Sequence, residues 1–586
     1  MLNKKGYVMV YAIGVIALLM VLTATLTNIT MTRSNWTNKQ VYNIQESSLA
    51  RTQVEAAASD LSVYLDEYIN EYNKYLYELN DEFESIFVDI ETRYGVEIRD
   101  LTKDSCVYPT NPDLDPCYPI PEETPDSDKH TYTYAYDIVY EGKNLVAQKR
   151  FFLSMIPSFL YFALGSKTDL TINGGAYIDG DMYVNRNLYL SDTTNYKVNS
   201  IIKNQPTSFS TVSPITNLYF STPTYNLYSC RQTVEQCYDL SGGVFQKNID
   251  TFLKMTNSFE YSTTFVEEPP KVKTYSDKFL DVDFDASFIY YINDAIDDKF
   301  RDVDIDNLET ELNTFVSENR LYVANTIEEI NFQDTQSVLI KDPPVIKNDL
   351  AFNKKEWIIV DGNLSIENYD NSNPPIFINA NFLVTGNITI SGNVQFNSTS
   401  YVLGHAAIHN ANINNENALP SDNQLVLLSK QDIQFSRINE FLNTFSGLEI
   451  DPITDDITIH PNIRGFFFTD SNLQIYTVNS YLTIEGGIFS NDTTNLEEDV
   501  NGDMNVIENV YITQTDSIGL LINAYRGEVN SNPSPTDPFS FSYSDYYKKA
   551  RFIISHNSDI IRTQPKGLPL NKQLNYLFED ITIKRL

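Results

Sequence analysis

A long uncharged stretch opens the pattern of apolar and polar positions, since no charged side chain occurs between Gly6 and Thr32. A helix of about 20 predominantly apolar residues is about 30 Å long, which is the thickness of a bilayer's hydrocarbon core. We therefore predict a transmembrane helix over residues 7–32, behind a basic leader that contains Lys4 and Lys5. A cleavable secretory signal is the alternative, but its apolar region is shorter, about 7–15 residues. Because cytoplasmic flanks carry an excess of basic residues, the leader is expected in the cytoplasm and the remaining chain outside.

After this stretch the apolar positions recur every three or four residues between acidic ones, which is the period of an amphipathic helix. The apolar stripe consists of Val54, Ala58, Leu61, Leu65, Tyr68, Tyr72, Leu76, Leu79, Phe83, Ile86 and Ile90. Gly95 suits the end of a helix. We therefore predict one amphipathic helix over residues 33–95.

Residues 96–155 change from a Pro- and Asp-rich loop to strictly alternating apolar and polar positions. Alternation on either side of a short polar segment is typical of two paired strands. We predict a β-hairpin from residue 131 to residue 155, with its turn at residues 141–144.

A six-residue unit repeats from Leu170 onward, with apolar residues at its first and third positions and Gly, Asn or Asp near its end. Copies begin at Leu170, Ala176, Met182, Ile358, Phe382, Ile388 and Leu482. Each unit suits a short strand with two inward side chains, followed by a corner where Gly or Asn adopts a positive φ. Three units would form one turn of about 18 residues, and stacked turns share a core, as in a parallel β-helix. An antiparallel sandwich with Gly turns is the alternative.

The repeat is not continuous, which sets the expected domain organisation. We predict the first β-helix units at 156–191, an inserted α/β lobe at 192–350, the main β-helix at 351–495 and a β-rich closing region at 496–586. Within the lobe, residues 279–296 and 307–318 have helical patterns. The predicted fold is therefore an N-terminal transmembrane and long amphipathic α-helix followed by a mainly-β ectodomain, an interrupted parallel β-helix with an α/β insertion.

Charge narrows the classes of partner. The formal net charge is -36, with 78 acidic against 42 Lys and Arg residues, and phosphate binding needs clustered Lys and Arg. We therefore expect no nucleic-acid partner. A solvated, self-repelling extracellular surface accounts for the acidity.

The four cysteines fall into two local pairs, Cys106 with Cys117 and Cys230 with Cys237. Neither spacing is that of a zinc-binding CxxC, and no His lies close in sequence to complete a zinc set. Because the pairs lie on the predicted outer side, two short-loop disulfides are expected, with free buried thiols as the alternative.

Few residues indicate chemistry. Asp499, Asn501 and Asp503 alternate around a Gly in an acidic loop, and these oxygen ligands suit a calcium ion, with a solvated acidic turn as the alternative. His405 and His409 have the spacing of two zinc ligands on a helix, but no Glu follows His405. We predict no enzyme and no cofactor other than this calcium candidate.

The leader and the first helix resemble those of type IV pilins and pseudopilins. The similar features are Lys4 and Lys5, then Gly6, then the aromatic Tyr7 at the start of the apolar helix. The resemblance implies that a prepilin peptidase cuts after Gly6 and that the freed helix packs into a filament core. The family usually has Glu at the fifth mature position, where this chain has Tyr11. This difference favours a minor or tip-proximal component, or an uncleaved membrane-anchored relative, over a major subunit.

Two further segments resemble PilX-type pilus-assembly proteins: the Ala- and Glu-rich residues 45–58, and residues 550–569 with their Pro-Lys-Gly-Leu-Pro turn. The predicted function is that of a membrane-anchored, extracytoplasmic structural protein, a minor pilin-like component of a type IV pilus or pseudopilus. Its expected partners are the membrane, pilin-like subunits or the pilus assembly machinery, and the prepilin peptidase. The alternatives are a cell-surface adhesin or stalk outside any filament, and a β-helix enzyme that acts on polysaccharides.

Overall fold

The computed structural model describes part of the chain. The described backbone comprises residues 4–71, 80–101, 133–198, 201–232, 236–239, 245–256, 260, 264–265, 269–276, 279–298, 301, 303–324, 326–330, 336–341, 344–353, 356–368, 374–413, 424–436, 448–450, 457–459, 461–478, 481–492, 519–529, 541–543, 550–558, 560–561, 565–569, 571 and 575–585. Side chains are described for these residues except 4–10, 67–71, 80–82, 197–198, 201–203, 328, 448–450, 457–459, 527–529 and 541–543.

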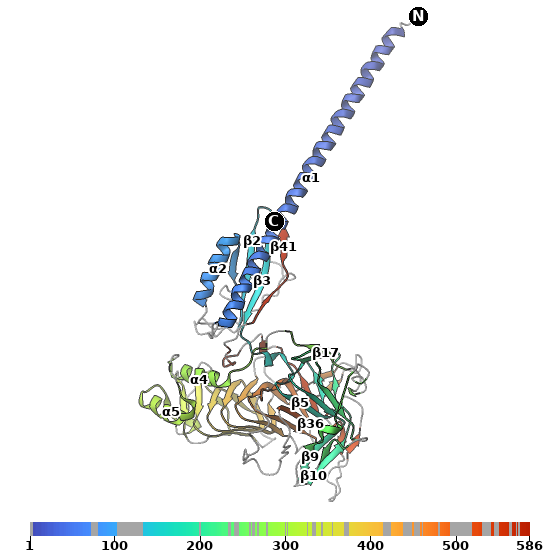
Figure 1. Cartoon of the computed structure of the whole chain (residues 1–586). Coiled ribbons are helices and arrows are strands. Elements are labelled where there is room, and N and C mark those ends of the chain that lie inside the picture. Colours follow the sequence, from blue (N-terminus) through green and yellow to red (C-terminus); the bar gives the residue numbers. More distant parts are fainter. Residues whose placement is uncertain are drawn as a thin grey trace. The chain divides into compact units, whose positions relative to one another are not determined.

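The chain forms two compact units, the first of residues 1–155 with 572–586 and the second of residues 156–571. The elements of the first unit are α1 (Lys4–Glu71), α2 (Asn80–Tyr94), β1 (Glu97–Asp100), β2 (Thr133–Glu141), β3 (Leu145–Ser154), β40 (Asn575–Phe578) and β41 (Thr582–Arg585). The strands form an antiparallel sheet in the order β1-β2-β3-β40, and β41 also pairs with β3 (Figure 1). The last strands of the chain therefore complete a sheet that begins near its start.

The predicted hairpin is confirmed, because β2 and β3 pair antiparallel from Thr133 with Ser154 to Glu141 with Val146. The prediction of one helix over 33–95 is wrong. Helix α1 ends at Glu71, and α2 is a second helix that packs against it. Both helices place their apolar stripes in the same core, together with the sheet. One long helix and two shorter helices can carry the same apolar stripe, so the pattern did not distinguish one helix from two.

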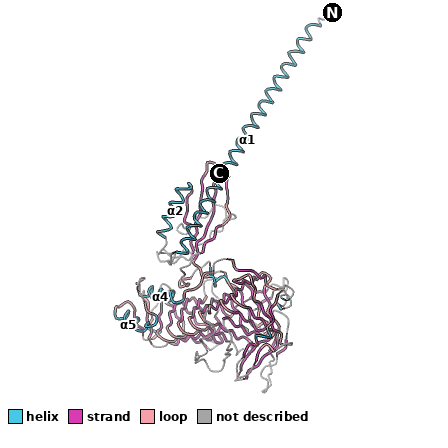
Figure 2. Tube along the Cα trace, in the orientation of Figure 1, coloured by secondary structure: helices cyan, strands magenta, loops and turns pink. Residues whose placement is uncertain are grey.

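The second unit is mostly β (Figure 2). Its strands form three ladders in which successive strands pair in parallel. The first ladder runs β18 (Tyr322–Ala324), β19 (Val338–Ile340), β22 (Trp357–Val360), β25 (Asn381–Val384), β27 (Ser398–Val402), β29 (Leu425–Ser429), β33 (Ile463–Thr469), β35 (Leu482–Ser490), β4 (Leu164–Ser166), β7 (Met182–Val184), β12 (Asn217–Phe220) and β17 (Lys271–Thr274).

The second ladder runs β20 (Val345–Ile346), β23 (Leu364–Asn368), β26 (Ile388–Phe396), β28 (Ala406–Ile413), β30 (Ile433–Ser436), β34 (Leu473–Thr477), β36 (Gly519–Ala524), β5 (Asp169–Gly174), β8 (Leu188–Ser191) and β13 (Leu227–Cys230), with β16 (Leu253–Lys254) added antiparallel. The third runs β21 (Leu350–Ala351), β24 (Ile376–Asn379), parts of β26, β28, β33 and β35, then β39 (Phe552–Ser555), β6 (Tyr177–Asp179) and β11 (Thr211–Val212). Several hydrogen bonds beside these ladders join residues 18 positions apart in sequence, for example Asn187 with Asp169, Asn397 with Asn379, and His405 with Asn387.

Chain order and ladder order differ in this unit. The late strands β35, β36 and β39 pair with the early strands β4, β5 and β6. The predicted inserted lobe at 192–350 is therefore corrected, because its strands β11, β12, β17, β18, β19 and β20 extend the same ladders. The closing region at 496–586 is also divided: β36 and β39 belong to the ladders, and β40 and β41 belong to the first unit. Longer connections in these segments interrupt the period although the strands still pair.

The remaining elements are short. They are the antiparallel pairs β9 (Thr193–Val198) with β10 (Ile201–Pro206), β14 (Tyr238–Asp239) with β15 (Gln246–Lys247), β31 (Leu448–Ile450) with β32 (Ile457–Ile459) and β37 (Gly527–Val529) with β38 (Phe541–Tyr543), the 3-10 helices η2 (Ser158–Tyr161), η4 (Ile249–Thr251), η5 (Ile305–Asn307) and η6 (Ile327–Glu329), and the helices α4 (Phe284–Ala295) and α5 (Leu308–Ser317). Helices α4 and α5 confirm the two helical patterns near residues 279–296 and 307–318.

Burial explains why apolar and polar residues alternate in some strands of the ladders but not in others. In β23 buried and partly exposed positions alternate, whereas every residue of β22, β25, β27 and β29 is buried. Helix α4 contributes to this burial, because its Phe284 and Tyr291 rings lie 5.7 and 5.3 Å from the Tyr401 ring on β27. Strands covered on both faces become continuous apolar runs, which hides the alternation.

Asparagines directly before the strands link neighbouring segments of the second ladder. The backbone N–H of Asn387 donates to Oδ1 of Asn363 at 2.8 Å, and the N–H of His405 donates to Oδ1 of Asn387 at 2.7 Å. At Gly392, φ is +79°, and an added Cβ would lie 1.8 Å from the carbonyl oxygen of Asn368. The Gly and Asn positions of the six-residue unit therefore reflect close contacts between rows.

Candidate functional site

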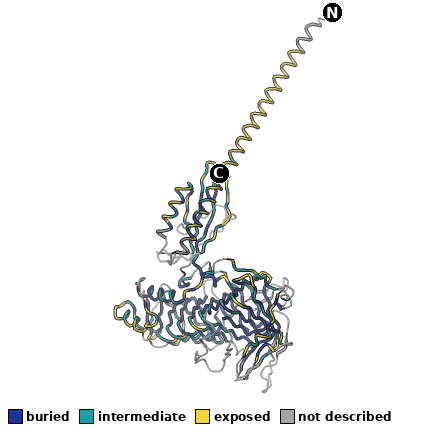
Figure 3. The backbone as a smooth tube through the Cα atoms, viewed as in Figure 1, coloured by how far each residue is buried: buried dark blue, intermediate teal, exposed yellow. Residues whose placement is uncertain are grey.

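Helix α1 is the candidate functional element, and its first part exposes apolar side chains. It is the one helix among the described residues that is long and apolar enough to cross a membrane, with a mean hydropathy of 2.1 and 0% burial in its apolar window. Met20, for example, is 68% exposed, and Figure 3 shows this part of the helix as exposed. An apolar helix face of this length requires lipid or other apolar helices as cover.

Threonines in this part lose much of their polar character. The hydroxyls of Thr23, Thr25 and Thr27 donate to the backbone carbonyl four residues earlier, at 2.7 to 2.8 Å. A hydroxyl bonded within its own helix does not need water as a partner. The Thr-rich segment is thus compatible with an apolar environment.

The second part of α1 is packed inside the first unit. Ala50, Val54, Ala57, Leu61 and Leu65 are buried. They share a core with side chains of α2, β2 and β3, including the ring of Phe151, and with partly buried side chains of β40 and β41. The same helix therefore carries an exposed apolar part and a part that is docked on a folded unit.

Polar contacts fix the docked part in place. Asp60 Oδ2 accepts hydrogen bonds from Arg93 at 2.8 Å and from the Tyr94 hydroxyl at 2.6 Å, which joins α1 to α2. The hydrogen bond to Asp60 raises the pKa of Tyr94 above its usual value. At the end of the sheet, Asn144 donates its backbone N–H to Glu46 Oε1 at 3.1 Å.

The C-terminal strands also contact α1. The Tyr576 hydroxyl on β40 donates to Asp66 Oδ1 at 2.8 Å. Burial, together with this hydrogen bond, raises the pKa of Tyr576 to about 12. Sequence reasoning did not single out Glu46, Asp60 or Asp66. Their signal was weak, because acidic residues flank the whole apolar stripe.

The predicted processing residues are only partly described. Helix α1 includes the backbone of Lys4, Lys5, Gly6 and Tyr7, but their side chains lie outside the described residues. Cys106 and Cys117 lie outside the described residues altogether, and so do the calcium candidates Asp499, Asn501 and Asp503.

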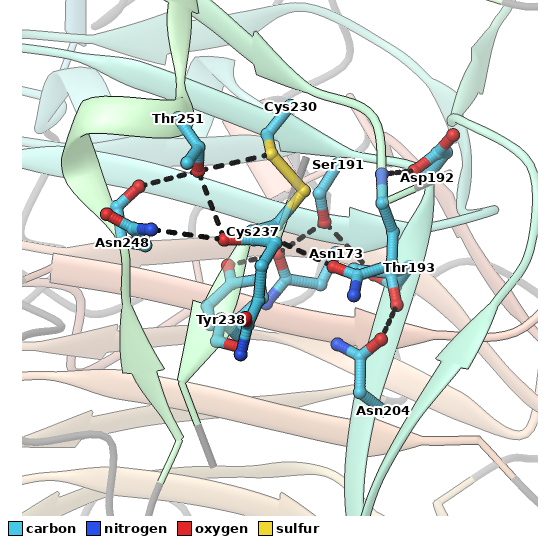
Figure 4. The surroundings of a disulfide bond; sticks show 12 residues. Asn173, Ser191, Asp192, Thr193, Asn204, Cys230, Cys237, Tyr238, Asn248 and Thr251 are labelled. Atoms are coloured by element: carbon cyan, nitrogen blue, oxygen red, sulfur yellow. Dashed lines mark hydrogen bonds between the residues drawn. A yellow bond between two sulfur atoms is a disulfide. The ribbon is translucent and has the colours of Figure 1, made fainter. Parts of the chain in front are cut away.

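Cys230 and Cys237 form a disulfide in the second unit, and both residues are buried (Figure 4). Beside it, the Tyr238 hydroxyl and Ser191 Oγ donate to Asn173 Oδ1 at 2.5 and 2.9 Å. The disulfide thus lies beside a buried polar cluster. Its spacing was the signal that predicted the pair.

The structure offers no metal site in its described part, where His, Cys, Asp and Glu side chains do not gather in groups of three or more that suit a metal ion. His405 directly precedes β28, and His409 lies on that strand. His409 Nδ1 is 2.7 Å from Ser436 Oγ, and burial lowers the pKa of His409. The two histidines are thus not a helical ligand pair.

Comparison with known proteins adds little. No family model and no curated protein matches the chain. Among solved structures, the chain is similar to the competence-associated pilin ComZ from Thermus thermophilus, at 8% identity and a TM-score of 0.27, over 78% of this chain and 82% of that chain. This score is too low to establish a shared fold.

Proposed function

We propose that the protein is a membrane-anchored, extracytoplasmic structural protein, a minor pilin-like component of a type IV pilus or pseudopilus. The observation that carries the proposal is the division of α1 into an exposed apolar part and a docked part. A subunit that moves from a bilayer into a filament needs an apolar helix that lipid and neighbouring helices can cover in turn, rigidly joined to a folded head. The PilX-like segments at 45–58 and 550–569 support the same assignment.

The proposal includes an orientation and a set of partners. The leader lies in the cytoplasm and the two units lie outside, because Lys4 and Lys5 precede the apolar helix. The partners are a prepilin peptidase at Gly6 and pilin-like subunits along the exposed part of α1. The protein is not an enzyme and needs no cofactor, and calcium bound at Asp499 to Asp503 is the one ion expected.

In this proposal the second unit is presented outside the cell. We infer that its three parallel ladders form an interrupted parallel β-helix. Rows spaced by 18 residues and asparagines stacked at the corners support this inference. A β-helix outside the cell would also suit a surface stalk, which is the alternative that the following experiment separates.

The decisive experiment is the N-terminal residue of the mature protein, purified from native membranes. Processing by a prepilin peptidase predicts Tyr7, and Gly6→Ala is expected to abolish this product. Gly14→Ala is the matched control: nothing lies within 4 Å of a Cβ at Gly14, so its cleavage should be normal. Retention of residues 1–6 would contradict the pilin proposal and favour a static stalk.

A further inference from the structure

A segment near the C-terminus crosses the outer face of the first ladder. We call Pro565–Pro569 the strap, and it has the sequence Pro-Lys-Gly-Leu-Pro. Gly567, Leu568 and Pro569 are buried. The strap belongs to the second unit, and β40 of the first unit begins at Asn575.

Side-chain hydroxyls hold the strap by its backbone. Three consecutive strap carbonyls accept hydrogen bonds: that of Lys566 from Thr399 Oγ1 at 2.7 Å, that of Gly567 from the Tyr401 hydroxyl at 2.8 Å, and that of Leu568 from the Tyr291 hydroxyl at 2.6 Å. Thr399 and Tyr401 lie on β27, whereas Tyr291 lies on α4. The strap is therefore held by side-chain donors from two separate elements, and none of these three contacts is a backbone ladder pair.

The strap side chains are also recognised. Lys566 Nζ lies 2.8 Å from Asp294 Oδ2, and Trp357 Nε1 donates to the same oxygen at 3.0 Å. Lys566 Nζ also lies 5.9 Å from the centre of the Trp357 ring. Leu568 is fully buried.

Gly567 makes the recognition sequence-specific. Its φ is +96°, and an added Cβ would lie 2.8 Å from Thr399 and 3.0 Å from Trp357. A side chain at this position is therefore excluded by conformation and by space. The surface accepts a Lys, then a Gly, then a Leu, between two prolines.

We propose that this surface is a peptide-binding site whose ligand is a Pro-Lys-Gly-Leu-Pro turn, and that the strap is its resident ligand. The strap-binding surface consists of Tyr291, Asp294, Trp357, Thr399 and Tyr401. When its own strap is disengaged, the surface binds the same segment from outside the chain, including that of a second copy. The proposal concerns residues of the second unit only and does not depend on the function of α1.

The test uses the full-length chain in detergent and a fluorescent peptide with the sequence of residues 564–571. In the Gly567→Val chain the strap is disengaged, whereas the five surface residues are unchanged. Peptide binding, measured by fluorescence anisotropy, is expected for this chain and at least tenfold weaker for the wild-type chain. The reason is that the tethered strap competes at an effective concentration on the order of millimolar.

Two controls make the result specific. A peptide carrying Gly567→Val should not bind. Adding Tyr291→Phe and Tyr401→Phe to the Gly567→Val chain removes two hydroxyl donors and should weaken binding about 25-fold, at about fivefold for each hydrogen bond. A Gly567→Val chain that unfolds cooperatively but does not bind the wild-type peptide would overturn the proposal.

A second measurement applies if the Gly567→Val chain does not fold. Tyr291→Phe and Tyr401→Phe in the otherwise wild-type chain keep both rings but remove the hydroxyls that hold the strap. Tryptic cleavage after Lys566 should then be about 25-fold faster than in the wild-type chain, by the same reasoning. An unchanged cleavage rate would show that these hydroxyls do not hold the strap, which also overturns the proposal.

Discussion

Leu61 offers the sharpest test of how α1 is docked. It lies in the packed part of the helix and is 0% exposed. Leu61→Ala removes three carbon atoms, each worth about 0.8 kcal/mol of burial. With the cost of the remaining cavity, the expected loss is about 3 kcal/mol in the free energy that holds α1 on the sheet.

Hydrogen exchange of the amides of residues 50–66, followed by mass spectrometry, measures this free energy directly. At tenfold for each 1.4 kcal/mol, a loss of about 3 kcal/mol predicts exchange about 150-fold faster. Leu49→Ala is the control, because Leu49 is 49% exposed on the same helix and should change exchange by no more than about twofold. Equal effects of the two substitutions would refute the division of α1 into an exposed and a docked part.

Three further changes test the second unit. Gly392→Ala places a Cβ against the carbonyl of Asn368 at a positive φ, and should lower the free energy of unfolding by about 3 kcal/mol. The control Gly14→Ala should change this free energy by less than about 1 kcal/mol. Thermal unfolding followed by circular dichroism measures both effects. Arg526→Met should lower the free energy of unfolding, measured by chemical denaturation, by about 3 kcal/mol. The buried guanidinium donates to two backbone carbonyls and a threonine hydroxyl, and without it these buried acceptors have no water to replace the lost donors. Burial raises the pKa of Asp470 from its usual 3.8 to about 6, so the folded state keeps this proton to higher pH and stability falls as the pH rises from about 4 to about 6. Asp470→Asn should therefore stabilise the chain by about 3 kcal/mol at pH 7 but not below pH 4, and an equal effect at both pH values would contradict this reasoning.

The sequence predicted those elements whose apolar pattern is decided locally. The uncharged stretch before Arg33, the hairpin turn at 141–144 and the six-residue unit each depend on neighbouring residues only. The docked part of α1 was also visible as a stripe. The stripe did not show where α1 ends and α2 begins, because Leu65 on α1 and Phe83 on α2 contribute to the same core.

The candidate site was less predictable because its contacts join distant parts of the chain. Asp66 meets Tyr576, which follows it by 510 residues, and Tyr401 meets Gly567, which follows it by 166. No local period encodes such pairs. The strap was recognisable as a Pro-bounded turn, but its partners Tyr291 and Tyr401 were indistinguishable from the many other tyrosines of the chain.

The order of the ladders shows most clearly where sequence reasoning ends. The repeat specifies how one row forms, and every row presents similar apolar strands to its neighbours, so the repeat allows any row to follow any other. The polar residues that join neighbouring strands are more selective about which strands become neighbours. Asn173 Nδ2 on β5 donates to Asn523 Oδ1 on β36 at 3.1 Å, and buried Arg526 donates to the carbonyl of Ala176 at 2.9 Å. A buried donor left without its acceptor is costly, so these pairs disfavour other row orders. We therefore expect the information that joins the late strands to the early ones to lie in a few buried polar residues and not in the apolar repeat.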